Sequence, residues 1–210
     1  MIDFTKAEWI FEPKEYEVCK QKVVLTTEPE TDFWQRSYYG FRNDNAPSLL
    51  LETEDNFTFT AKVEFDYKAR FDQCGLIIYL DHENWFKASI EYENQEYSRL
   101  GSVVTNCGYS DWATADIRLP SFIWYRLSRR GPDFLIESSV DGVVFKQMRV
   151  FHLHQLGETT EEMGQSDPPI AAKGSVRFGV YACSPSQSSL TAIFSEMSFG
   201  ECEWMAHHVE

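Results

Sequence analysis

Residues 57–67 read Phe-Thr-Phe-Thr-Ala-Lys-Val-Glu-Phe-Asp-Tyr, a strict alternation of apolar and polar side chains. Successive side chains of a β-strand point to opposite faces of its sheet. The apolar set, from Phe57 to Tyr67, therefore falls on one face and the threonine, lysine and acidic side chains fall on the other. This stretch predicts a strand with one face in a hydrophobic core and the other in water.

The same alternation, or a β-rich composition, recurs along the chain, and turn signals separate many of the segments. Asp81 to Asn84 indicates a tight connection between two strands, and Val140-Asp141-Gly142-Val143 carries the Asp-Gly signal of a β-hairpin. Short connections of this kind favour antiparallel sheets. The further strands are expected at residues 22–27, 48–53, 73–81, 84–93, 97–106, 122–130, 133–140, 143–150, 174–182 and 189–199.

One long segment, residues 155–173, is polar and irregular and contains two consecutive prolines. We interpret it as a connection between strands, with a loop over the mouth of the sandwich as the alternative. No repeat, heptad or shift in composition marks a second domain. We therefore expect one all-β domain over residues 1–210.

Composition and charge exclude several classes of function. Hydrophobic residues make up 43% of the chain, enough for a sizeable core, and the formal charge of −14 opposes binding to nucleic acid or to an anionic membrane. The first residues show no signal peptide and no later segment is long and apolar enough to cross a bilayer, so we expect a cytoplasmic protein. The five cysteines are scattered and never form Cys-x-x-Cys, which argues against a disulfide framework and a structural zinc site.

The most informative surface is the polar face of the strand predicted at residues 84–93. Phe86, Ala88 and Ile90 alternate toward the core, which leaves Trp85, Lys87, Ser89 and Glu91 on the opposite face. On the preceding strand Gln73 falls on the same non-core side, and elsewhere Trp124 shares a face with Arg126, and Arg177 with Tyr181. If these faces lie in one sheet, they form a surface of aromatic rings, amides and charges that suits a sugar-like ligand.

The sequence supports a catalytic site or a metal site less well than it supports this ligand-binding face. Glu91 and Glu93 alternate onto one face, as the two carboxyl groups of a glycosidase require, but Glu93 adjoins an expected turn, so we interpret the pair as solvated charges at the edge of the sheet. His152 and His154 share a strand face and two more histidines stand at positions 207 and 208, yet neither pair has carboxylates at a useful spacing. We expect no metal and no cofactor.

Several ordered motifs carry a family resemblance. They are Asp32-Phe33-Trp34, Tyr39-Gly40-Phe41, Phe71 to Leu76, Trp85 to Glu91, Ser102 to Thr105, Ser110-Asp111-Trp112, Trp124 to Leu127, Arg130-Gly131, Ser139 to Gly142, and Arg149. Together they resemble a concanavalin A-like family of unknown function whose description is "regulation of enolase protein". The resemblance covers nearly the whole chain and implies a jelly-roll sandwich of two antiparallel sheets, without a catalytic residue to carry over.

These observations lead to three functional hypotheses. The first is a non-catalytic module that binds a carbohydrate or another small polar ligand on a concave sheet face. The second is a glycan-cleaving or glycan-modifying enzyme in which Glu91 acts as acid or base. The third is a cytoplasmic module that binds a protein partner. The predicted ligand-binding residues are Trp34, Tyr39, Gln73, Trp85, Lys87, Glu91, Asp111, Trp112, Arg126 and Tyr181.

Overall fold

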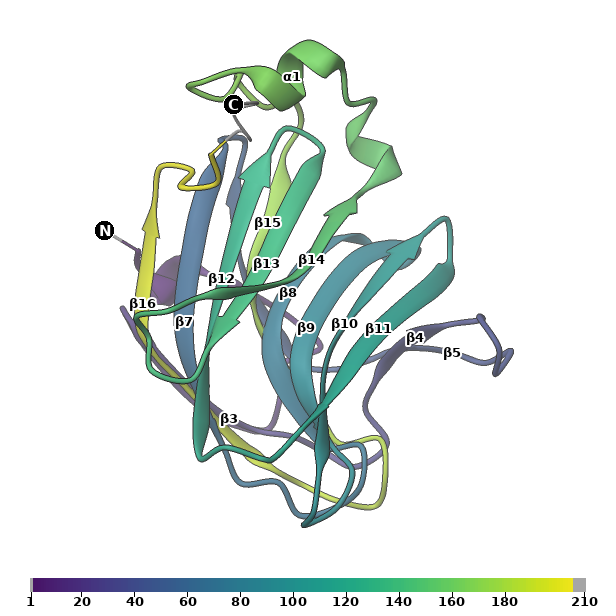
Figure 1. Cartoon of the computed structure of the whole chain (residues 1–210). Coiled ribbons are helices and arrows are strands. Elements are labelled where there is room, and N and C mark those ends of the chain that lie inside the picture. The colour runs from purple at the N-terminus through teal and green to yellow at the C-terminus, as the bar shows by residue number, and fades with distance from the viewer. Residues whose placement is uncertain (1, 206–210) are drawn as a thin grey trace.

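The computed structural model describes residues 2–205 and is a sandwich of two seven-stranded antiparallel sheets (Figure 1). The all-β, jelly-roll prediction is confirmed. The first sheet contains, in spatial order, β1 (Glu8–Ile10), β6 (Ser48–Thr53), β15 (Val176–Cys183), β8 (Gln73–Asp81), β9 (Asn84–Tyr92), β10 (Ser98–Asn106) and β11 (Tyr109–Ile117).

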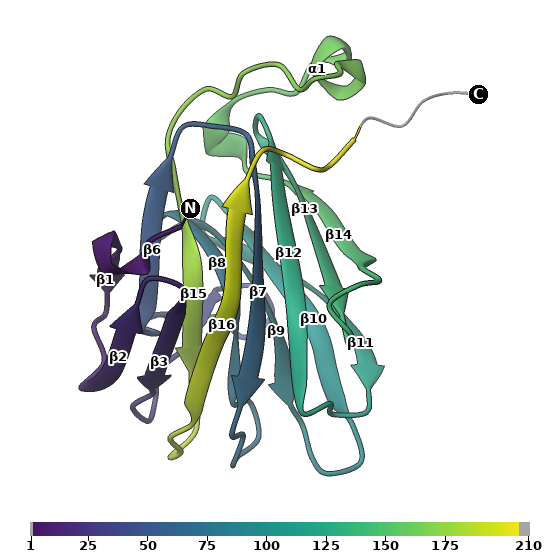
Figure 2. The ribbon, with the colours of Figure 1, turned by 90° about the vertical axis from the view of Figure 1, so that its left-hand side faces the viewer.

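The second sheet lies against the first, and Figure 2 shows its strands side by side. Its order is β14 (Lys146–His152), β13 (Asp133–Ser139), β12 (Phe122–Arg130), β7 (Phe57–Phe65), β16 (Thr191–Gly200), β3 (Lys22–Thr26) and β2 (Glu15–Cys19). A separate hairpin joins β4 (Phe33–Gln35) to β5 (Arg42–Asp44), and the short helices are η1 (Phe4–Lys6), η2 (His154–Leu156) and α1 (Glu161–Gln165).

The core between the sheets is built from the apolar faces of the alternating strands. Phe57 and Phe59 of β7 are fully buried and pack on Phe178 of β15, with ring centroids 4.7 Å and 5.2 Å apart. Phe199 of β16 stacks on Phe178 at 5.1 Å. Burial of each such side chain contributes roughly 1.5–3 kcal/mol. The stretch that predicted the fold therefore lies at the centre of the core.

The two predicted turns are present. Asp81 lies opposite Asn84 at the β8–β9 hairpin, and the Asp81 carboxylate accepts a hydrogen bond from the backbone N–H of Glu83 at 2.8 Å. At the second turn, Gly142 takes a φ of 72°, and the Asp141 carboxylate accepts from two following backbone N–H groups. Because this loop continues beyond the Asp-Gly pair, β14 begins at Lys146 and not at residue 143.

The sequence patterns did not reveal β11, the edge strand of the first sheet. Most of its side chains are exposed on both faces, so the apolar and polar positions do not alternate. β11 is recognised by its pairing with β10, in which Val103 lies opposite Trp112.

The β4–β5 hairpin lies on the outer face of the first sheet, away from the second sheet (Figure 1). The hairpin is anchored to the ends of strands in the first sheet. The backbone N–H of Gln35 donates to Ser110 Oγ at 2.9 Å, the Gln35 side chain donates to the carbonyl of His82 at 3.0 Å, and Arg36 pairs with Glu83 at 2.8 Å. Phe33, fully buried, covers a second apolar cluster beneath the hairpin. One end of the outer sheet face is thereby closed.

Residues 155–173 pass over one end of the sandwich and include α1 (Figure 1). Arg130 holds this segment by donating to the carbonyls of Met163 and Ser166, at 3.1 and 2.6 Å, and the Asn56 side chain donates to the carbonyl of Ile170 at 2.7 Å. None of the helices within residues 2–205 has the length and apolar character needed to cross a membrane.

Candidate functional site

The outer face of the first sheet contains a cavity of about 460 Å³ beside the β4–β5 hairpin. Its residues come from β8, β9, β10 and β11, from the hairpin, and from the loops after β7 and β15. A cavity of this size lies within the range of small-molecule sites, about 300–1,000 Å³. The lining residues are Asp32, Trp34, Tyr39, Phe41, Asn43, Arg70, Phe71, Gln73, Lys87, Glu91, Glu93, Arg99, Val103, Trp112, Pro185 and Ser186.

A buried ion pair forms part of the cavity floor. Lys87 Nζ lies 3.1 Å from Asp32 Oδ1, and the two side chains are 5% and 14% exposed. Burial alone would lower the pKa of Lys87, but the nearby carboxylates, Asp32 foremost and then Glu91, outweigh it and raise that pKa. Lys87 therefore remains a cation at the base of the cavity, with the ring of Tyr181 centred 5.8 Å from its ammonium.

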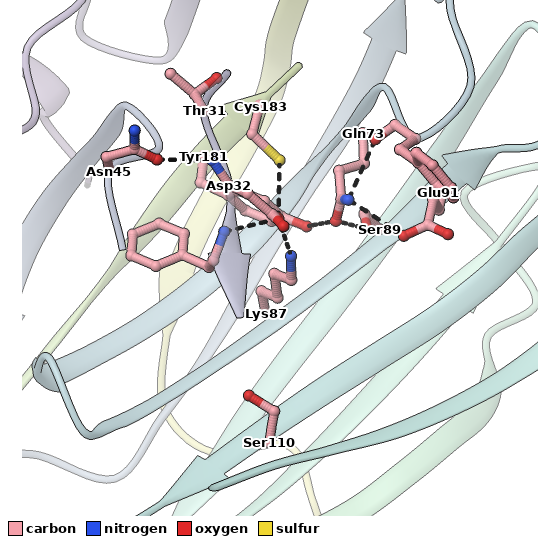
Figure 3. A network of polar contacts seen from close by, with 12 residues as sticks. Thr31, Asp32, Asn45, Gln73, Lys87, Ser89, Glu91, Ser110, Tyr181 and Cys183 are labelled. Carbon is pink, nitrogen blue, oxygen red and sulfur yellow. Dashed lines mark hydrogen bonds and ion pairs between the residues drawn. The ribbon is translucent and has the colours of Figure 1, made fainter. Parts of the chain in front are cut away.

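Gln73 connects the buried polar groups on the other half of the floor (Figure 3). Its carbonyl oxygen accepts from the Tyr181 hydroxyl at 3.1 Å and from the Ser89 hydroxyl at 3.4 Å. Its amide nitrogen donates to Glu91 Oε2 and to the carbonyl of Phe71, both at 3.2 Å. The amide is thus held in one orientation, and it presents Glu91 to the cavity.

Glu91 differs from the other carboxylates of the site because its hydrogen-bond partner is an amide and not a cation. Burial raises the pKa of Glu91 to about 7, assisted by the negative charges of Asp32 and Glu93 and opposed by Lys87 and Arg99. Near neutral pH this carboxyl group is present in both forms, so it can accept a hydrogen bond from a ligand hydroxyl or donate one.

Glu93 follows the end of β9 and lies between two arginines. Its carboxylate is 2.5 Å from Arg70 and 3.2 Å from Arg99, and its side chain is only 8% exposed. The interpretation of Glu91 and Glu93 as solvated edge charges is therefore wrong for both residues, because loop and strand neighbours enclose them. The Arg99 guanidinium also lies 5.5 Å from the ring centre of Trp112.

Aromatic rings form the walls of the cavity. Tyr39 packs edge-on against Trp34, with centroids 5.5 Å apart, and stacks on Phe41 at 5.4 Å. The Trp34 indole N–H donates to the carbonyl of Ser37 at 3.0 Å, which fixes the ring at the base of the hairpin. Trp112 stands on β11. Trp34 and Trp112 are partly exposed, and each also packs on the second apolar cluster, so each has a core side and a cavity side.

Of the ten residues predicted for the site, six line this cavity and a seventh lies directly beneath it. Lys87 and Glu91 come from β9, Gln73 from the start of β8, and Tyr181 is the buried hydrogen-bond donor to Gln73. The six lining residues are Trp34, Tyr39, Gln73, Lys87, Glu91 and Trp112.

Three predicted residues are placed elsewhere. Trp85 shares the face of Lys87 but is fully buried under Phe33, with ring centroids 5.4 Å apart. Arg126 lies on β12 of the second sheet and pairs with Glu137 at 2.7 Å, so its expected place beside Lys87 is wrong. The prediction that Asp111 belongs to the site is also wrong. Asp111 points to the opposite face of β11 from Trp112 and pairs with Arg149 at 2.5 Å.

The prediction missed several groups that the fold adds to the site. Asp32 precedes β4 and reaches Lys87 across 55 positions of sequence, and Arg70 reaches Glu93 from the loop after β7. For Asp32 the available signal was the motif Asp32-Phe33-Trp34. For Glu93 it was the alternation with Glu91. Arg70 and Arg99 had no such signal, because contacts between distant loops and strands leave no local period.

The candidate metal residues have other contacts. His152 Nδ1 lies 2.8 Å from Asp133, and the rings of His152 and His154 are 5.1 Å apart. Within residues 2–205, no group of three or more histidine, cysteine or acidic side chains is arranged to hold a metal ion. Residues 207 and 208 lie outside the described part of the chain.

Comparison with known proteins confirms the expected resemblance. The chain is 30% identical over 198 residues to "Regulation of enolase protein 1" of Saccharomyces cerevisiae, covering 93% of this chain and 90% of that protein. A crystal structure of a functionally unknown protein from Saccharomyces cerevisiae superposes with a TM-score of 0.79 at 28% identity, covering 95% of this chain and 98% of that one.

A more distant structure shares the fold alone. The GH43 BlXynB protein from Bacillus licheniformis superposes with a TM-score of 0.64 at 14% identity, and the match covers 90% of this chain but 35% of that one. A family model whose description is "Protein of unknown function (DUF1349)" matches residues 9–202. With nearly the whole sandwich inside that match, the chain belongs to the DUF1349 family of unknown function.

Proposed function

We propose that this protein is a non-catalytic module that binds a carbohydrate or a sugar-like ligand in the cavity of the first sheet. The observation that carries the proposal is the combination of a polar floor with aromatic walls. Lys87 and Glu91 offer hydrogen-bonding groups to ring hydroxyls, with Gln73 holding Glu91 in place, while Trp34 and Trp112 offer flat apolar faces for the C–H side of a sugar ring.

The geometry favours binding because the floor is already rigid. The Lys87–Asp32 pair and the Gln73 network hold their side chains in place before a ligand arrives. Groups that are ordered in the free protein lose little conformational entropy on association, which increases affinity. The paired cations and carboxylates also leave few charged groups free to take part in a reaction.

The test is a thermal-shift screen against neutral monosaccharides and oligosaccharides, followed by calorimetric titration of the sugars that raise Tm. A ligand at about 100 times its Kd stabilises the folded state by about 2.7 kcal/mol, which is readily measured. Tyr39→Ala and Glu91→Gln should each weaken binding. Tyr38→Ala is the matched control, because Tyr38 adjoins Tyr39 but is 96% exposed and does not line the cavity.

If no sugar raises Tm, or if Tyr39→Ala and Glu91→Gln both bind as tightly as the wild-type protein, the proposal is overturned. Lys87→Ala would not distinguish these outcomes. Removal of Lys87 leaves the Asp32 carboxylate buried without its partner, so a loss of binding would also report a loss of stability.

A second candidate is a glycan-cleaving or glycan-modifying enzyme, favoured by the largely buried Glu91 carboxyl with its pKa raised by burial to about 7. A carboxyl group with such a pKa is suited to give and take a proton at neutral pH. Turnover of aryl-glycosides or oligosaccharides that is lost in Glu91→Gln would support the enzyme. Binding without turnover across the same panel would support the binding module.

A third candidate is a cytoplasmic module that binds a protein partner, favoured by the exposed aromatic tip of the β4–β5 hairpin. Tyr38, Tyr39 and Phe41 are 96%, 56% and 45% exposed and contact one another in series. The name of the yeast relative makes purified enolase the first partner to test. A stoichiometric complex that forms without sugar and is lost in Tyr38→Ala would favour this candidate.

A further inference from the structure

The β4–β5 hairpin determines how much of the outer sheet face a ligand can reach. The hairpin is fastened where the strands turn: Gln35 bonds to Ser110 and to the carbonyl of His82, and Arg36 pairs with Glu83 of the β8–β9 turn. Phe33 and the buried Trp85 then fill the space between the hairpin and the sheet. Along the strand direction, the face is therefore blocked at this end.

The cavity occupies the opposite end of the same face. Its floor residues lie at the start of β8 and toward the end of β9, at Gln73 and Glu91. Across the strands it is bounded on one side by Trp112 of the edge strand β11 and on the other by the loops that carry Phe71 and Pro185. Enclosure on three sides makes this a pocket and not a groove through which a chain could continue.

The volume agrees with this enclosure. About 460 Å³ lies toward the lower end of the range of small-molecule pockets, far less than an extended polysaccharide requires. Tyr39 and Phe41 project from the hairpin at the cavity wall, where a second or third unit of a chain would have to pass.

The charges of the pocket balance internally. Lys87 is paired with Asp32, and Arg70 and Arg99 are both paired with Glu93. With Glu91 ionised, as it is above its pKa of about 7, the pocket holds three cations, Lys87, Arg70 and Arg99, against three anions, Asp32, Glu91 and Glu93; when Glu91 is protonated, each cation still has a carboxylate partner in Asp32 or Glu93. An anionic or cationic ligand would be left without a counter-charge unless it displaced one of these pairs, which costs free energy in a partly dried site.

We propose that the pocket receives one uncharged sugar unit, either a free monosaccharide or the unit at the end of a chain, and excludes the interior of a polysaccharide. This inference rests on the proposed carbohydrate-binding function and names the class of ligand. The aromatic hairpin wall determines the limit on length, and the paired charges determine the preference for a neutral ring.

The experiment is calorimetric titration of the wild-type protein with one neutral monosaccharide, its uronic acid, its linear oligomers and a long polysaccharide of the same unit. Affinity per mole of chain should change by less than about threefold from the monomer to the longest oligomer, and at pH 8, where Glu91 is ionised, the uronic acid should bind at least about tenfold more weakly. At equal mass, the polysaccharide should compete poorly, because it offers few chain ends. A monomer that binds as well as its oligomers identifies a free sugar as a sufficient ligand, whereas oligomers that bind and a monomer that does not identify a chain end.

Affinity that rises about tenfold or more with chain length, or a polysaccharide that competes as well as its oligomers at equal mass, would show an open groove and overturn the inference while the carbohydrate-binding function stands. Tighter binding of the uronic acid would overturn the preference for a neutral ligand. If none of the sugars binds, the proposed function itself fails.

The double variant Tyr39→Ala/Phe41→Ala tests the wall directly, with Tyr38→Ala as its control. Both tyrosines and Phe41 are exposed, so these substitutions preserve the core. The double variant should bind the monomer more weakly and should bind long oligomers better than the monomer, whereas Tyr38→Ala should behave as the wild type. If the ratio of the affinity for long oligomers to the affinity for the monomer is the same in the double variant as in the wild type, the hairpin wall does not limit chain length.

Discussion

Glu91 should make the protein less stable as pH rises, the opposite of what most carboxylates do. Replacement of Glu91 by glutamine should remove this effect. Burial raises the pKa of Glu91 to about 7 in the folded protein, against 4.5 for the ordinary side chain. Between these two values the folded state holds a proton that the unfolded state has released. The free energy of unfolding therefore falls as pH rises through this window, by about 1.4 kcal/mol per unit of pKa difference, or roughly 3 kcal/mol in all.

Glutamine removes this titration and keeps the contact, since its carbonyl can still accept the hydrogen bond from Gln73. The difference in unfolding free energy between Glu91→Gln and the wild type should thus move in favour of the variant by about 2–3 kcal/mol between pH 5 and pH 8. Because whole domains are stable by only about 5–15 kcal/mol, this effect is large.

The assay is urea denaturation of both proteins without ligand at pH 5, 6, 7 and 8, with the m-value used to check that the unfolding transition is unchanged. Glu96→Gln, in the turn between β9 and β10, controls for the loss of one negative charge from this highly acidic chain, because its side chain is exposed. A stability difference between Glu91→Gln and wild type that stays constant across the four pH values would refute the reasoning, as would one that moves in favour of the wild type.

Three further predictions concern stability and reactivity. Lys87→Met should cost about 3–5 kcal/mol of unfolding free energy, measured by urea denaturation, and the added substitution Asp32→Asn should recover much of that loss; recovery of none of it would mean that the ion pair is not the cause. Gly75→Ala should unfold the protein or lower its Tm severely, because its Cβ would lie 1.9 Å from a carbonyl oxygen of β9, whereas Gly200→Ala has open space and should leave Tm nearly unchanged; similar Tm values for the two variants would contradict the close strand packing. Burial raises the pKa of the Cys74 thiol to about 12, so in the native protein it should react with a thiol reagent far more slowly than the two exposed cysteines, and at their rate only in denaturant; rapid labelling of Cys74 in the native state would refute its burial.

Some residues of the candidate site could be predicted from sequence, because the face on which they lie follows from alternation within a single strand. The alternation within β9 placed Lys87 and Glu91 together and away from the core, and the structure brings both into the cavity. The same rule sends Asp111 to the opposite face of β11 from Trp112, but residues 109–117 lack the apolar period by which a strand is recognised, so the sequence patterns predict no strand there.

Other parts depend on contacts between segments that lie far apart in the chain. Alternation places Trp85 on the same side of β9 as Lys87, yet Phe33 of the hairpin buries it. Arg126 has the pattern of a polar strand face, yet β12 belongs to the second sheet, where Arg126 pairs with Glu137. Alternation tells on which side of its own strand a residue lies, but it does not tell to which sheet the strand belongs or what covers that side.

The sequence by itself determined that this chain forms antiparallel strands with a phenylalanine-rich core, since hydrophobic alternation and turn residues act locally and leave a period of two. Its ordered motifs also indicated the family. The enclosure of the pocket and the pairing of its charges were decided by the tertiary structure alone. Its closure by the β4–β5 hairpin, the pairing of Asp32 with Lys87, and the pairing of Glu93 with Arg70 all join residues that are distant in sequence. Such contacts arise when the sheets assemble, and the burial that they produce gives Glu91 its raised pKa.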